Sequence, residues 1–191
     1  MFNTNEAAVS RFYIGELAWG RQLSYMLAFN IVLIASSYIQ IPLPFSPVPV
    51  TAQAMAVLAC GLFLGPGRAA LTVLAYLTEG AMGLPVFAGG TAGLVKFFGP
   101  TGGYLIGFVG AAFVVGMLSE KIQSMTFGKL LGVLSLGMVC IYIPGLTVIS
   151  LFVPEGAVLK MGLYPFLPGM AVKLMITASA LSAYKKIRRS I

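Results

Sequence analysis

Long apolar runs alternate along this chain with short stretches that are polar or rich in glycine and proline. Three stretches carry no formal charge at all: 22–67, 97–119 and 130–154. At about 1.5 Å per residue, a helix in each could cross the roughly 30 Å hydrocarbon core of a bilayer. We therefore predict an all-α polytopic membrane protein, a bundle of six transmembrane helices in one domain, 1–191. Its apolar segments lie at about 22–41, 50–64, 69–84, 101–119, 130–151 and 165–184.

Basic residues set the expected orientation, because cytoplasmic loops of membrane proteins are enriched in Lys and Arg. With both termini cytoplasmic, only Lys96 and Lys160 fall outside, and Lys173 lies within the sixth segment. We therefore predict a cytoplasmic N-terminal segment, 1–21, and a basic cytoplasmic tail, 185–191. The basic residues that fall inside are Arg11, Arg21, Arg68, Lys121, Lys129, Lys185, Lys186, Arg188 and Arg189.

Composition supports the same class. Hydrophobic residues make up 59% of the chain and charged residues 9%, against roughly 25% charged in soluble domains. The net charge of +7 is explained by this topology and by contact with anionic membrane lipid, so it does not indicate nucleic-acid binding. The two cysteines, Cys60 and Cys140, lie in apolar runs and are interpreted as buried thiols, with neither a disulfide nor a metal implied.

A proline-rich segment, PLPFSPVPVT at 42–51, follows the first apolar run. Proline excludes helix interior and favours an extended, stiff backbone. The segment is therefore either a rigid linker after a helix or a lid over an outward-facing pocket, in which Phe45 would supply an apolar contact.

A second unusual segment, PVFAGGTAGLVKFFGPTGG at 85–103, is rich in glycine. Turns at Gly89 and Gly90 could expose N–H groups to a ligand, since glycine tolerates positive φ. The alternative is close helix packing through small residues, which fits Gly103, Gly107 and Gly110 at helical spacing. The chain has no Gly-Lys-Ser/Thr sequence and therefore no recognisable phosphate-binding loop.

Two charges fall inside apolar segments. Lys173 would lie about 12 Å below the outer end of its helix, a depth at which an ammonium needs a partner. It is either a counter-charge or donor for a ligand, or it extends to the membrane surface. Glu79 would lie about 8 Å deep; it could pair with Lys173, accept N–H groups of a ligand, or reach the interface.

The chain contains no His and no Asp. This excludes a metal site or a His-based catalytic triad built from this chain alone. We expect no enzymatic activity, although a small membrane enzyme that uses Ser–Lys or Glu chemistry stays open.

Four motifs taken together resemble the BioY family, the biotin-specific substrate-binding (S) components of energy-coupling factor (ECF) transporters. They are IPLPFSPVPVTAQ, YLTEGAMGLPVFAGG, FGPTGGYLIGF and YPFLPGMAVK, which occur in this order between about 40 and 175. The resemblance implies six membrane helices with cytoplasmic termini in the bacterial cytoplasmic membrane. It also implies high-affinity biotin binding near the outer face and no cofactor. The implied partners are a transmembrane T protein with two ABC-type ATPases, or self-association.

The resemblance also suggests site residues. Lys173 occupies the lysine of the family's Pro-Gly-Asp-x-x-Lys pattern and is carried over as ligand-binding. Thr51, Gln53, Tyr104 and the turn at 89–90 follow as pocket candidates. The chain departs from the pattern at Met170, where the family has Asp three residues before the lysine. We hypothesise that Glu79 replaces this carboxylate across the pocket.

Three rival functions remain open at this stage. The chain could be an S component for another vitamin, such as thiamine or riboflavin. It could be a small membrane enzyme acting on lipid-linked substrates, or a structural subunit that binds no small ligand.

Overall fold

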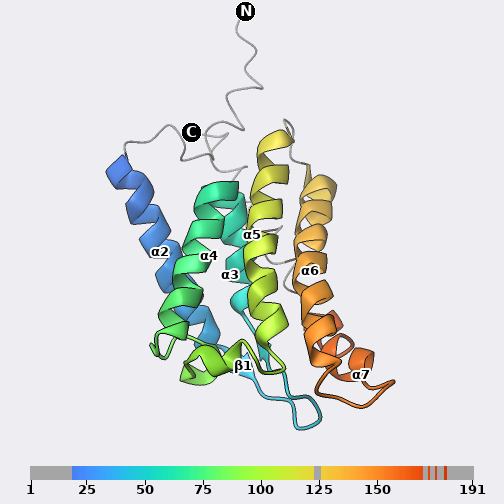
Figure 1. Ribbon diagram of the computed structural model, residues 1–191. Coiled ribbons are helices and arrows are strands. Elements are labelled where there is room, and N and C mark those ends of the chain that lie inside the picture. The colour runs from blue at the N-terminus through green and yellow to red at the C-terminus, as the bar shows by residue number, and fades with distance from the viewer. Residues whose placement is uncertain (1–18, 123–125, 170–171, 173–174, 176–178, 180–191) are drawn as a thin grey trace, which may run out of the picture.

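The computed structural model describes residues 19–122 and 126–169, together with 172, 175 and 179. Five long helices run side by side (Figure 1), with short strands and turns gathered at one end of the bundle. The elements in chain order are α2 (Trp19–Tyr38), β1 (Gln40–Ile41), β2 (Val50–Thr51), α3 (Gln53–Leu64), α4 (Pro66–Ala81), η2 (Ala88–Gly90), η3 (Leu94–Lys96), α5 (Gly102–Lys121), α6 (Phe127–Ile149) and α7 (Val158–Gly162).

Helix α5 occupies the middle of the bundle and packs against α3, α4 and α6. Its contact with α6 is close because two glycines face that helix. A Cβ atom at Gly103 would lie 2.1 Å from the backbone oxygen of Pro144, and one at Gly107 would lie 2.9 Å from that of Cys140. The packing role expected for these two glycines is confirmed. At Gly110 it is wrong, because a Cβ there would meet nothing within 4 Å.

The element boundaries differ from the expected ones where turn chemistry intervenes. The second apolar segment begins with strand β2, which pairs antiparallel with β1, so its helix starts only at Gln53. The inner loop expected at 65–68 reduces to Gly65, with φ 76°, because Pro66 already starts α4. Proline suits a first helical turn, where its missing N–H would have no helical partner.

The proline-rich segment contains no helix between 42 and 49, as its prolines predict. Instead it forms the long loop of the β1–β2 hairpin. Ser46 Oγ donates a hydrogen bond to the backbone oxygen of Met161 in α7, at 2.7 Å. The hairpin loop and α7, distant in sequence, are therefore tied together at the same end of the bundle.

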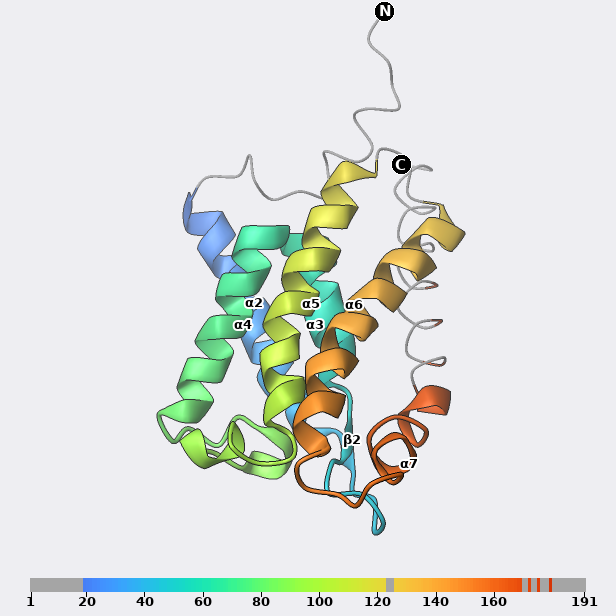
Figure 2. The same cartoon turned by 45° about the vertical axis from the view of Figure 1, so that its right-hand side comes forward.

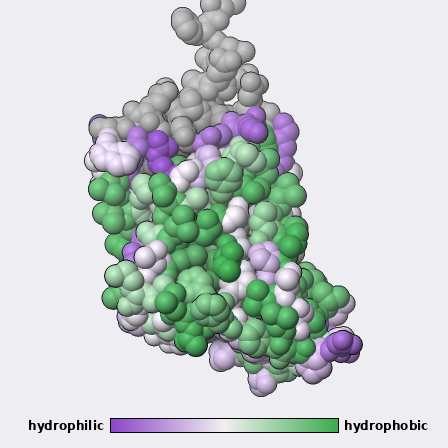
Figure 3. All heavy atoms as spheres, viewed as in Figure 1, coloured by the Kyte–Doolittle hydropathy of each residue, from purple (hydrophilic) through white to green (hydrophobic). Residues whose placement is uncertain are grey.

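The outer surface of the bundle is largely apolar along its length. In Figure 3 the flank of the helices is mostly green, and purple residues gather towards the upper end. Exposed large apolar side chains include Leu27, Ile31 and Leu71. Within the described residues, α5 and α6 are long and apolar enough to cross a membrane, judged by length and composition alone.

Candidate functional site

A cavity of about 170 Å³ lies at the end of the bundle that carries the hairpin, whose residues Pro47 to Pro49 and Thr51 line it. Its walls come from segments far apart in the sequence: the hairpin, the start of α3, the glycine-rich segment, α5, α6 and the residues after α7. Figure 2 shows β2 and α7 near the same end of α5 and α6. The lining residues are Pro47, Val48, Pro49, Thr51, Gln53, Ala54, Phe87, Ala88, Thr91, Lys96, Thr101, Tyr104, Leu105, Phe108, Met138, Ile141, Tyr142 and Phe166.

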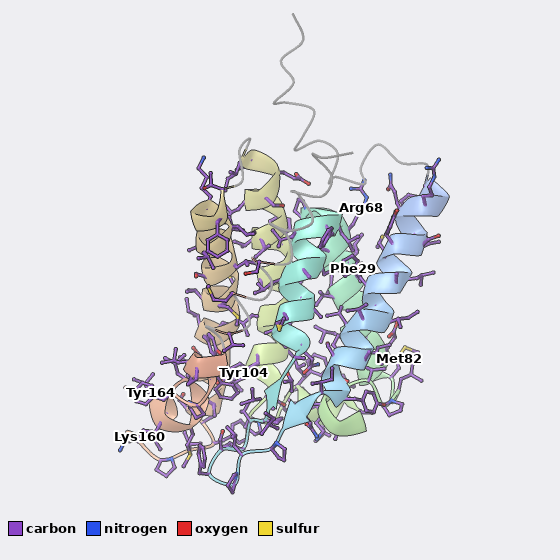
Figure 4. The ribbon with its side chains drawn as sticks, turned by 180° about the vertical axis from the view of Figure 1, so that it is seen from behind. Phe29, Arg68, Met82, Tyr104, Lys160 and Tyr164 are labelled. Atoms are coloured by element: carbon purple, nitrogen blue, oxygen red, sulfur yellow. The ribbon has the colours of Figure 1, made fainter. Side chains whose placement is uncertain are left out.

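One wall of the cavity is a cluster of three aromatic rings. Tyr104 of α5, Tyr142 of α6 and Phe166 contact one another with ring centroids 6.2 to 6.3 Å apart. Tyr104 Oη donates a hydrogen bond to the backbone oxygen of Gly162 at 2.8 Å. The ring of Tyr104 therefore faces the cavity, while its hydroxyl fastens α7 to α5. Figure 4 shows Tyr104 at the same end of the molecule as Tyr164 and Lys160.

Another wall is formed by the glycine-rich segment, from which Phe87, Ala88 and Thr91 line the cavity. Phe87 is buried and packs edge-on against Tyr76 and Phe97, with centroids 5.7 and 5.8 Å away. The backbone turns sharply after Phe87, where Gly89 and Gly90 have φ of 68° and 72°. Residues with a Cβ rarely adopt these values, which accounts for the glycine pair.

We expected the turn at Gly89 and Gly90 to expose its N–H groups to a ligand, but neither residue lines the cavity. Gly90 N–H donates to the backbone oxygen of Phe87 at 2.9 Å. Neither Gly89 nor Gly90 lines the cavity, although Ala88 and Thr91 beside them do. A Cβ at Gly89 would lie 2.4 Å from Gln40 Nε2. The pair thus shapes the wall and allows it to approach strand β1.

Polar groups reach the cavity at few places. Thr51 and Gln53 line it from the end of β2 and the start of α3, and Thr91 and Thr101 from the glycine-rich segment and its end. Lys96, at the end of η3, is the charged residue that lines it within the part of the chain that the structure describes. As far as its described lining residues go, the cavity combines apolar walls with one cation and a few hydrogen-bonding side chains.

The sequence-based site residues divide into three groups. Thr51, Gln53 and Tyr104 line the cavity as expected. Phe45 is 54% exposed and is not a lining residue, so the structure does not make it a lid contact. Lys173 and Met170 lie outside the described residues.

Glu79 has a different environment from the one expected. Its Oε1 accepts a hydrogen bond from Asn30 Nδ2 of α2 at 3.0 Å, and Glu79 is not among the residues that line the cavity. Gln22, eight residues before Asn30, accepts a hydrogen bond from Arg68 Nε of α4 at 2.9 Å. These polar contacts hold α2 against α4, and they place Glu79 in a helix–helix interface instead of opposite a ligand.

Sequence reasoning missed Lys96 as a site residue and used it only to set orientation. A signal was present: Lys96 is the one basic residue between Arg68 and Lys121. It stands between Val95 and Phe97, in the segment already singled out. Tyr142 and Phe166 carried no such signal, since aromatic residues are common throughout apolar helices.

Comparison with known proteins identifies similar chains. The family model described as "BioY family" matches residues 7–190. A "Biotin transporter BioY" of Thermotoga maritima is 38% identical over 168 residues, which cover 87% of this chain and 97% of the relative. A "Biotin transporter BioY" of Rhizobium etli is 35% identical over 167 residues, which cover 83% of this chain and 89% of the relative.

A solved structure is similar over most of its length. It is a crystal structure at 2.1 Å of the S-component for biotin from an ECF-type ABC transporter. The match has a TM-score of 0.79 and 30% sequence identity, and covers 88% of this chain and 91% of the solved one.

Proposed function

Because this chain belongs to the BioY family, we infer that it binds biotin and takes it up as the S component of an ECF-type transporter. The observation that carries this inference is the make-up of the cavity. Its described lining residues give aromatic and aliphatic walls, one cation and a few polar side chains. Biotin has matching parts: an anionic carboxylate, an apolar valeryl chain with a thioether ring, and a polar ureido group. Small-molecule sites commonly combine apolar walls with a few well-placed polar groups in this way.

Each part of biotin has a suitable group in the cavity. Lys96 is a counter-charge for the carboxylate, since burial beside an ammonium compensates an anion for lost hydration. The ring cluster of Tyr104, Tyr142 and Phe166 covers the apolar parts. Gln53 and Thr51 supply polar contacts for the ureido group. Lys173 remains a further ligand-binding candidate, on the strength of the family pattern.

The arrangement in the membrane follows from the same premise. We assign six membrane helices with cytoplasmic termini, which puts the hairpin, the cavity and α7 at the outer face. Biotin enters there, the hairpin loop covers it, and the loaded protein reorients and releases biotin inward. No catalytic step is assigned to the chain. Since it has no phosphate-binding sequence, the energy comes from partners: a T protein and two ABC-type ATPases, or a self-associated form that works without them.

Biotin titration of the detergent-purified protein tests the assignment, with thiamine and riboflavin as comparison ligands. Saturable binding of biotin alone is expected, and biotin uptake by cells should rise when the protein is produced. Uptake measured with and without the T protein then separates the module-dependent from the self-sufficient form. Preferential binding of another vitamin, binding of none, or conversion of a ligand would each refute biotin uptake as the function.

A further inference from the structure

Behind the cavity wall lies a hydrogen-bonded chain that joins Gln53, Tyr76 and Val86. Gln53, the first residue of α3, lines the cavity and is 3% exposed. Its Nε2 donates to Oη of Tyr76, which is fully buried on α4. Tyr76 Oη in turn donates to the backbone oxygen of Val86 at 2.9 Å. Tyr76 is not a lining residue, so any effect it has on a ligand passes through its neighbours.

The chemistry of these three groups fixes the direction of the Gln53 amide. The carbonyl oxygen of Val86 can only accept a hydrogen bond, and the phenol of Tyr76 has a single hydrogen to give. Once that hydrogen goes to Val86, the phenol oxygen is left as an acceptor. Gln53 must therefore turn its NH₂ group towards Tyr76. Among the described residues no hydrogen bond reaches Gln53 Oε1, which leaves this oxygen as an acceptor for the cavity.

We propose that Tyr76 is a positioning residue that holds the Gln53 amide so that Oε1 accepts an N–H of the ureido group of biotin. The proposal rests on the proposed function and adds a specificity device to it. If the amide were reversed, its NH₂ would meet the ureido N–H donor against donor. A site built to bond an N–H discriminates strongly against a ligand that lacks it, because the buried acceptor is then left without a partner.

A purely structural role for Tyr76 must be separated from this one. Its hydroxyl also holds Val86, and its ring packs edge-on against Phe87 in the cavity wall. Loss of the hydroxyl could therefore weaken binding by loosening the wall. The two roles differ in one respect: the positioning effect requires Gln53, whereas support of the wall does not.

A double-mutant cycle measures that difference in the full-length purified protein. We expect Tyr76→Phe to weaken biotin binding about 10-fold in the native background, but less than about 2-fold when Gln53→Met is already present, because interacting residues are not additive. Thr72→Val, four residues earlier on α4, is the matched control. It removes a buried hydroxyl that donates to the backbone oxygen of Arg68 and lies beside Cys60. Neither Thr72 nor Cys60 lines the cavity, so the affinity should be unchanged.

A second measurement concerns the N–H itself, with two biotin derivatives that are each methylated on one ureido nitrogen. The native protein should bind one derivative at least about 10-fold more weakly than biotin, and Gln53→Met should reduce that ratio several-fold. This measurement does not need the Tyr76→Phe variant, so it remains valid even if that variant does not fold. The melting temperature of Tyr76→Phe in detergent shows whether it folds. The proposal is overturned if Tyr76→Phe weakens biotin binding equally in the native and the Gln53→Met backgrounds. It is also overturned if Gln53→Met leaves the affinity ratio between biotin and the methylated derivative unchanged. If the native protein binds no biotin, the proposed function itself is overturned.

Discussion

Among the residues that the structure describes, the charged side chain that lines the cavity belongs to Lys96. In the sequence it is an exterior charge that helps to set orientation. In the structure it is half-buried and lines a cavity with the rings of Phe87 and Tyr104. A cation in such a place favours an anionic ligand, because the low local polarity strengthens the attraction between opposite charges.

Replacing this charge gives a direct prediction. Lys96→Met should weaken biotin binding by about 10- to 100-fold, because a charge-assisted hydrogen bond contributes about 1.5–3 kcal/mol. Lys160→Met is the matched control: it removes a charge at the same end of the molecule, but from the exposed surface of α7. Equilibrium dialysis with labelled biotin measures both. Similar affinities for the two variants would contradict the role of Lys96.

Glu79 shows the opposite outcome at the residue scale. Its depth in an apolar helix left three roles open, and the departure from the family pattern at Met170 suggested a carboxylate that faces a ligand. In the structure, one of its oxygens instead accepts a hydrogen bond from Asn30 of α2. A carboxylate in an apolar helix needs a polar partner of some kind. The sequence predicts that need, but the choice of partner depends on how α2 lies against α4.

At the scale of elements, the pair α5 and α6 holds the cavity together, since both helices contribute lining residues. The backbones of the two helices are close where Gly103 and Gly107 face the segment of α6 around Pro144. Because Pro144 lacks an N–H, it cannot bond to the oxygen of Cys140 one turn earlier. The absent side chain of Gly107 leaves room for that oxygen to lie close to α5.

This contact predicts opposite effects for two glycine substitutions on one helix. Gly103→Ala should destabilise the protein by about 1–3 kcal/mol, because its Cβ would meet backbone atoms of α6 and force the helices apart. Gly110→Ala should raise stability by about 0.5–1 kcal/mol, since alanine is the better helix former and its Cβ has open space. Thermal unfolding in detergent compares them. This packing would be contradicted if Gly110→Ala lowered the melting temperature. It would also be contradicted if Gly103→Ala left the melting temperature unchanged.

At the scale of the whole molecule, the site is confined to one end of the bundle. The hairpin, the glycine-rich segment and α7 all lie there (Figure 1). Arg68 lies at the opposite end from Lys160 (Figure 4). This separation agrees with the orientation derived from the basic residues, in which Arg68 is inside and Lys160 outside.

The orientation itself can be measured by labelling single cysteines on the two sides of α6. After Cys60→Ala and Cys140→Ala, a membrane-impermeant maleimide should label Lys160→Cys in intact spheroplasts. It should label Lys129→Cys, at the first turn of α6, only after permeabilisation. The physical reason is that the apolar length of α6 puts its two ends on opposite sides of the bilayer. The reverse labelling pattern would invert the proposed topology and place the cavity on the cytoplasmic side.

The sequence by itself determined the helical class, the approximate positions of the long helices that the structure describes and the segments that build the site. These features depend on local chemistry: apolar runs form helices, prolines exclude them, and glycines permit the sharp turn after Phe87. Three of its pocket candidates, Thr51, Gln53 and Tyr104, lie in the cavity wall for the same reason, since they stand beside those segments.

Only the tertiary structure decided which side chains share the cavity and which serve packing. Lys96, Tyr142 and Phe166 are distant in sequence and meet only because α5, α6 and the glycine-rich segment converge. The packing of the helices also brings Asn30 within hydrogen-bonding distance of Glu79, and Gln53 within hydrogen-bonding distance of Tyr76. A hydrogen bond between two helices depends on their mutual rotation to within a fraction of a turn, and no local pattern of residues encodes that rotation.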